Sequence, residues 1–127
     1  MDTLIKDFLS FLSGSRSSFF ASREIQKRLN EAGFICLPEN KPFKLSSGGK
    51  YYLQRQGTAI LAFITGSEKF AKGGFNLAGS HIDYPCLKLK PQSIKTEKGI
   101  TKIGVQLYGS PIISTWLDRE LGIAGKI

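Results

Sequence analysis

His81 and Asp83 are the residues whose types and spacing best fit chemistry at a metal ion. His81 is the only histidine among the 127 residues, and Asp83 follows two positions later. Side chains at i and i+2 of an extended strand share a face, so a strand here would place imidazole and carboxylate on one side. A metal-bound imidazole usually needs a carboxylate or carbonyl at its second nitrogen to fix its tautomer and orientation. A hydrogen-bonded structural pair, or a turn at Asp83-Tyr84-Pro85, explains the same spacing more often, so the pair alone establishes no site.

The neighbouring residues predict a strand that delivers this pair. Apolar residues lead into His81 and Asp83, and Pro85 ends the run. We therefore expect a buried strand from Phe75 to Ser80 with two polar groups at its carboxyl end, where open α/β sheets bind their ligands.

Two amphipathic helices are predicted near the start of the chain. Residues 3–13 carry apolar side chains at helical spacing, bounded by Asp2 or Thr3 at one end and Gly14 at the other. A second helix is predicted over residues 18–32, because a glycine follows an amphipathic run.

Three strands are predicted to follow these helices. They are Phe34 to Leu37, Lys50 to Arg55 and Thr58 to Thr65, and Gln56-Gly57 forms a tight turn between the last two. Residues 59–64 are apolar almost without interruption, which predicts a strand covered on both faces. The predicted fold class is α/β, a partial sandwich of helices on a mixed sheet.

The pattern changes beyond Pro91. Ser93 to Val105 predicts two short strands around a Glu97-Lys98-Gly99 turn, and a further strand is predicted over residues 112–117. Asp118-Arg119-Glu120 resembles a catalytic cluster, but we interpret it as a surface turn with local ion pairs. Trp116, within the last of these strands, is interpreted as a packing or interface residue.

The composition is that of one ordinary globular domain, with 41% hydrophobic and 22% charged residues. No run of about 18 apolar residues predicts a membrane span. The amphipathic, acid-containing start does not fit a signal peptide. Cys36 and Cys86 suggest neither a disulfide framework nor a cysteine-rich metal site, and we interpret both as small hydrophobic residues.

The net charge of +8 leaves two interpretations open. Five lysines fall between residues 88 and 102, which could mark a stand-alone, non-catalytic basic module that binds a partner or nucleic acid. Lys88 and Lys90, however, alternate with Leu87 and Leu89, the pattern of a half-buried strand with one solvated face. Aromatic residues are not interleaved with these lysines as a single-strand binder would need, so we favour the solvated face.

Three segments of the chain resemble one protein family. G-S-H-I-D-Y-P-C-L-K-L-K-P, which ends at Pro91, resembles the G-A-H-T-D-S-P-C-L-K-[VL]-K-P segment of the aspartyl aminopeptidases, a family of zinc metallopeptidases. Gly104 to Ile127 is similar to that family's G-V-E-x-Y-G-G-G-x-W-x-T-W-x-D-R-D-L-x-x-A-G-[RK]-[VI]. Gly48 to Gly66 resembles the family's hairpin after its second helix. The three segments follow in the family's order, which makes the resemblance more specific than any one motif.

The resemblance implies roles and an organisation for the chain. It implies that His81 is a zinc ligand and that Asp83 orients that ligand as the supporting catalytic residue. It implies that residues 1–91 are the amino-terminal part of a catalytic domain and that residues 92–127 begin an inserted, β-rich oligomerisation domain. It further implies a cytoplasmic homo-oligomer that removes N-terminal acidic residues from peptides, with two Zn²⁺ ions in each complete site.

Most of that active site is missing from the sequence. The family's other metal carboxylates, its general base and its final histidine belong to segments further along, so we expect this chain alone to be inactive. The missing part could act as a separate chain beside it. Ile82 and Tyr84 replace a threonine and a serine of the family's motif, and we expect Tyr84 to narrow the mouth of the site.

Overall fold

The computed structural model describes residues 2–66, 74 and 76–126. Contacts between residues divide the chain into two compact units. The first contains the residues up to Ile82 together with the segment that begins at Ala124, and the second runs from Asp83 to Ile123. The division thus passes between His81 and Asp83. The predicted boundary near Pro91, between a catalytic domain and an inserted domain, rests on the family resemblance and stays a prediction.

Both predicted helices are present in the first unit. Helix α1 spans Thr3–Gly14, and the Asp2 side chain caps it by accepting a hydrogen bond from a backbone N–H of the first turn. Helix α2 spans Ser18–Glu31, and the hydroxyl of Ser17 accepts from the first turn in the same way. These contacts satisfy amide groups that have no partner inside a helix.

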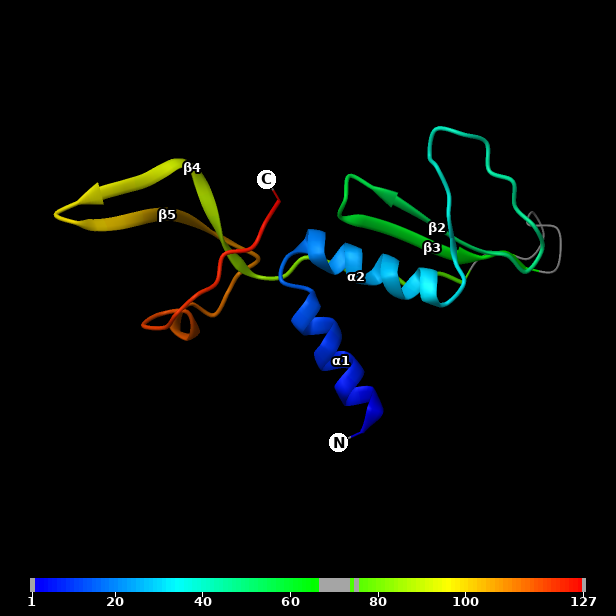
Figure 1. The fold of residues 1–127 in the computed structure, drawn as a ribbon, viewed down its shortest axis with the longest axis horizontal. Coiled ribbons are helices and arrows are strands. Elements are labelled where there is room, and N and C mark those ends of the chain that lie inside the picture. Colours follow the sequence, from blue (N-terminus) through cyan, green and yellow to red (C-terminus); the bar gives the residue numbers. More distant parts are fainter. Residues whose placement is uncertain (1, 67–73, 75, 127) are drawn as a thin grey trace. The chain divides into compact units, whose positions relative to one another are not determined.

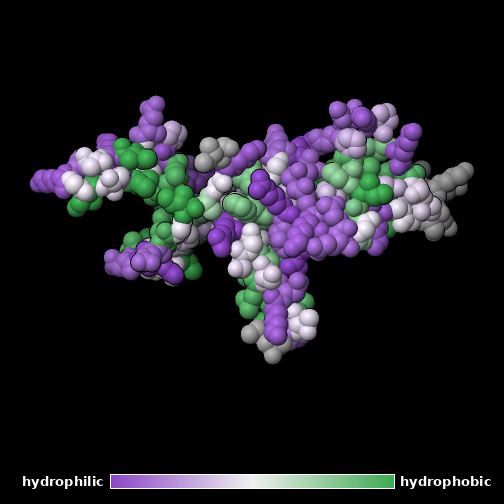
Figure 2. Space-filling view, in the orientation of Figure 1, coloured by the Kyte–Doolittle hydropathy of each residue, from purple (hydrophilic) through white to green (hydrophobic). Residues whose placement is uncertain are grey.

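Arg28 of α2 links the two helices. Its Nη1 lies 2.7 Å from Oδ2 of Asp7 in α1, and its guanidinium lies over the Phe11 ring at 5.2 Å from the centroid. The hydrogen bond from Arg28 holds the pKa of the Asp7 carboxyl below its ordinary value. Apolar side chains along α1 nevertheless stay exposed (Figure 2). Leu4 and Phe8 are both more than half exposed. The described residues therefore do not cover this face of the helix.

The sheet of the first unit has three strands in the order β1-β2-β3. Strand β1 (Ile35–Cys36) pairs in parallel with β2 (Lys50–Arg55), and β2 pairs antiparallel with β3 (Ala59–Ile64). Residues 56–58 join β2 to β3, and Gln56 and Gly57 both have positive φ, which matches the right-handed twist of a tight hairpin. The predicted helices and mixed sheet of an α/β fold are confirmed.

Helix α2 runs beside the β2–β3 hairpin (Figure 1). The hydroxyl of Tyr52 on β2 donates to the side-chain oxygen of Asn30, and Gln54 Nε2 donates to Ser22 Oγ. Tyr52 is 3% exposed and Ser22 is fully buried. The core of the first unit therefore lies where α2 covers the sheet.

Two expectations about this sheet are wrong. Leu61 and Ile64 of β3 are more than half exposed and lie on opposite faces of the strand, so the described residues leave both faces partly uncovered, where the sequence predicted both to be covered. The strand predicted over residues 75–80 is absent from residues 76–80, and Phe75 lies outside the described residues. A strand needs a neighbour for its backbone groups, and residues 76–80 pair with no strand of the described chain.

The second unit is built on one long antiparallel hairpin. Strand β4 (Cys86–Glu97) pairs with β5 (Ile100–Tyr108), and Lys98-Gly99 forms the turn between them (Figure 1). The turn is where the sequence predicted it, and both strands are longer than predicted. The pairing shifts register between Leu89 and Ile94. Pro91 within this shift has no N–H to donate, which explains why the ladder is interrupted there.

The segment after β5 differs from its predicted strand. Ile113–Thr115 forms a 3₁₀ helix, in which the Thr115 hydroxyl donates to the Ile112 carbonyl at 2.7 Å. This local hydrogen bond favours the turn over an extended strand. Leu117 to Arg119 form an exposed bend, as predicted for this surface segment. Arg119 donates to the Thr115 carbonyl, and the predicted local ion pairs are absent among the described residues.

Gly109, which follows β5, is required on two grounds. Its φ is 72°, and a Cβ at this position would lie 3.1 Å from Cα of Pro85. We expect Gly109→Ala to lower the free energy of unfolding by about 2–3 kcal/mol, from left-handed strain and backbone crowding together. Gly99→Ala is the matched control, because Gly99 also has positive φ but open space around its Cα. Denaturant unfolding should show a loss for Gly109→Ala about 1 kcal/mol larger than for the control. Equal losses would contradict the close approach to Pro85.

Candidate functional site

His81 lies in an irregular segment at the end of the first unit. Residues 76–85 belong to neither sheet, and the His81 side chain is exposed. The Ser80 hydroxyl donates to the His81 backbone carbonyl at 3.3 Å. Because this segment is not a strand, the alternation of strand side chains does not by itself set the face of the imidazole.

Asp83 begins the second unit and is half-buried. Its Oδ2 accepts a hydrogen bond from the hydroxyl of Tyr108, the last residue of β5. This bond and the nearby carboxylate raise the pKa of the Tyr108 phenol, because removing its proton would place two negative charges together. The hairpin thus brings a tyrosine from 25 positions later in the chain onto the carboxylate.

Sequence reasoning did not assign a role to Tyr108. No spacing rule links it to Asp83. The contact between Tyr108 and Asp83 depends on the register of the hairpin, in which Tyr108 is directly opposite Cys86. A sequence whose strand ends are uncertain by a few residues does not reveal such a pairing.

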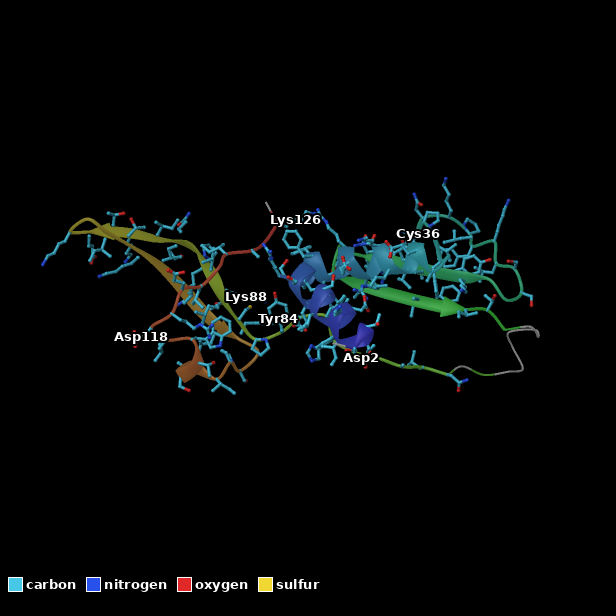
Figure 3. The ribbon with its side chains drawn as sticks, turned by 60° about the horizontal axis from the view of Figure 1, so that its bottom comes forward. Asp2, Cys36, Tyr84, Lys88, Asp118 and Lys126 are labelled. Carbon is cyan, nitrogen blue, oxygen red and sulfur yellow. The ribbon has the colours of Figure 1, made fainter. Side chains whose placement is uncertain are left out.

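Tyr84 and the two cysteines are the other residues that the sequence analysis considered near the site or as ligands. Tyr84 is 41% exposed, and Figure 3 shows it beside the start of β4. Cys86 is half-buried and Cys36 is exposed, and both are free thiols. The narrowing of the site by Tyr84 stays a prediction.

The His81 imidazole and the Asp83 carboxylate are groups of the kind that zinc binds, but they are fewer than a complete zinc site needs. Imidazole and carboxylate are zinc ligands or supporters of zinc ligands, and structural or catalytic zinc needs three or four protein ligands. Within residues 2–66, 74 and 76–126, no three His, Cys, Asp or Glu side chains gather closely enough to hold a metal ion. The described residues by themselves therefore form no closed metal site.

The lysines of the second unit lie along the hairpin. Lys88 Nζ lies over the Tyr108 ring at 3.3 Å from its centroid, and Lys102 pairs with Glu97 at 3.0 Å. Lys95 and Lys102 are opposite each other across the ladder. Two of these lysines thus have partners within the hairpin, which fits a solvated strand surface.

In the same part of the chain that the structure describes, no helix has the length and apolar character needed to cross a membrane.

Comparisons with known proteins point to one family. The family model described as aminopeptidase I zinc metalloprotease (M18) matches residues 11–127. A probable aspartyl aminopeptidase of Ricinus communis is 40% identical over 121 residues, covering 95% of this chain and 25% of the relative. A probable M18 family aminopeptidase 2 of Ectopseudomonas mendocina is 36% identical over 126 residues, covering 99% and 29%.

Solved structures agree with these relatives. The crystal structure of yeast aminopeptidase 1 matches with a TM-score of 0.81 at 33% identity, over 91% of this chain and 28% of that one. The S. cerevisiae mApe1 dodecamer matches with a TM-score of 0.82 at 33% identity, over 92% and 28%. The chain thus spans 29% or less of the length of the curated relatives named here. On the match of its residues 11–127, the chain belongs to the M18 family of aminopeptidase I zinc metalloproteases.

Proposed function

We propose that this chain is the amino-terminal part of a zinc aminopeptidase that removes N-terminal Asp or Glu from peptides. The observation that carries the proposal is the family match over residues 11–127, which includes the only histidine of the chain. The resemblance of the H-I-D-Y-P-C segment to the aspartyl aminopeptidases supports the acidic preference. The same resemblance supports a cytoplasmic homo-oligomer, and one structural neighbour is described as a dodecamer.

In this proposal His81 is a metal ligand and Asp83 fixes the orientation of its ring. Residue His81 is exposed, and a carboxylate that accepts the second ring N–H of a metal-bound histidine fixes its tautomer and orientation. Bound zinc polarises a scissile carbonyl and lowers the pKa of a bound water. Two zinc ions per complete site are expected, and their other ligands come from residues outside the described part of this chain.

Asp83 and the Tyr108 hydroxyl that bonds to its carboxylate belong to the same unit. We propose that the chain is inactive without the remaining ligands, because one histidine and one carboxylate bind zinc too weakly for catalysis.

The test is a peptide panel applied to the natural protein, meaning this chain with every segment that accompanies it in the cell. We expect release of N-terminal Asp or Glu and at least about 10-fold lower kcat/KM for peptides that begin with a neutral residue. Acetylating the amino terminus should abolish cleavage, and a chelator should abolish it reversibly. Cleavage of internal bonds, or activity that survives chelation, would contradict the proposal.

A further inference from the structure

The base of the β4–β5 hairpin is its open end, where Cys86 and Tyr108 pair, and it is hydrogen-bonded to Asp83. Asp83 lies three residues before β4, and Tyr108 is the last residue of β5. Cys86 and Tyr108 are opposite each other in the ladder, and this register brings the Tyr108 hydroxyl to the Asp83 carboxylate. The hydrogen bond is therefore a consequence of how the two strands pair.

Two further contacts hold Tyr108 in place. The ammonium of Lys88 lies over its ring at 3.3 Å from the centroid, a cation–π arrangement that restrains the ring (Figure 3 labels Lys88 on β4). Gly109 approaches Pro85 so closely that a Cβ there would lie 3.1 Å from the proline Cα. The side chain, the ring and the following turn are thus each fixed by a contact within the second unit.

A tyrosine at this position can set the rotation of the aspartate. The terminal torsion of an aspartate side chain is broad, so a carboxylate without directed partners samples many orientations. A hydroxyl donor at Oδ2 restricts this torsion, because the bond fixes the direction of one carboxylate oxygen. Both oxygens of an ionised carboxylate accept hydrogen bonds, so an imidazole N–H can bond to a group that is held in this way.

We propose that Tyr108 is a positioning residue for Asp83, so that the base of the β4–β5 hairpin orients the carboxylate that supports the zinc ligand His81. This inference rests on the proposed function. It gives the hairpin a part in metal binding besides any part in assembly. Tyr108 itself touches neither metal nor substrate, and it acts through Asp83.

The test is Tyr108→Phe in the natural protein, because this change removes the hydroxyl and keeps the ring beneath Lys88. After removal of metal, titration with zinc alone should show affinity about 10-fold weaker than in the unmodified protein, as for other groups that support a ligand. In the reloaded enzyme, kcat should fall by about 10-fold while KM changes by less than about twofold. Tyr52→Phe is the matched control, because it removes a hydrogen-bonded tyrosine hydroxyl on β2. We expect the control to leave zinc affinity unchanged.

A double variant shows whether the effect passes through Asp83. In an Asp83→Asn background, Tyr108→Phe should weaken zinc binding by less than about twofold, because the group it positions is already altered. An equal loss in both backgrounds, or no loss from Tyr108→Phe alone, would overturn the inference. The variant His81→Ala shows whether a negative result concerns only the positioning role of Tyr108 or the proposed function as well. If it abolishes zinc binding while Tyr108→Phe does not weaken it, only the positioning role is wrong. If His81→Ala leaves zinc binding intact, the proposed function is wrong as well.

Discussion

Replacing His81 with alanine in the natural protein is expected to weaken zinc binding by at least about 100-fold, because even groups that only support a ligand contribute about 10–100-fold. Aminopeptidase activity should fall with the zinc, since both the activated water and the polarised carbonyl depend on the metal. The measurement is zinc content after dialysis against a weak chelator, together with kcat/KM on an Asp-initiated peptide.

Cys86→Ser is the matched control for this variant. The thiol of Cys86 is a potential zinc donor five positions after His81, and serine keeps nearly the same shape. We expect zinc content and kcat/KM of the control to match those of the unmodified protein. Loss of zinc in the control, with full zinc in His81→Ala, would move the ligand role from the histidine to the cysteine.

The largest expected loss of stability comes from Tyr52→Ala. Tyr52 is 3% exposed between the sheet and α2, and its hydroxyl donates to Asn30. Removing a buried aromatic ring creates a cavity, so the free energy of unfolding should fall by about 3–5 kcal/mol. Tyr52→Phe keeps the ring and loses one hydrogen bond, for which about 1 kcal/mol is expected. Denaturant unfolding of the natural protein measures both values. A loss below about 1 kcal/mol for Tyr52→Ala would show that this contact is not part of the core.

Local rules were sufficient for the helices and the tight hairpins. Asp2 and Gly14 bound α1, and Gln56-Gly57 turns between β2 and β3, because caps and turns depend on a few neighbouring residues. The Glu97-Lys98-Gly99 turn followed from the same chemistry. These elements fix the α/β character of the first unit and the hairpin of the second.

Properties that depend on distant partners were not predictable in the same way. The apolar run before His81 predicted a strand, yet residues 76–80 find no strand partner in the described chain. Residues 112–117 were predicted to form a strand, yet a hydrogen bond from the Thr115 hydroxyl to the Ile112 carbonyl favours a 3₁₀ turn. Hydrophobic pattern shows which residues can be buried, and it does not show whether a neighbour is present to pair with them.

The candidate site shows the same contrast between local patterns, which were predictable, and contacts of distant residues, which were not. Residue types and spacing identified His81 and Asp83, and the resemblance to a family assigned their roles. Tyr108 was not found, because it reaches Asp83 only through the register of two strands. A carboxylate's supporting partners are set by tertiary structure, and so they are the part of a site that sequence reveals least.

The most direct test of this account is the position of zinc in a crystal of the natural protein, located by anomalous scattering at the zinc absorption edge. We predict an anomalous peak at about 2.0–2.1 Å from a ring nitrogen of His81, the usual zinc–imidazole distance. Zinc bound elsewhere in the protein, with the His81 imidazole outside its coordination sphere, would contradict the account.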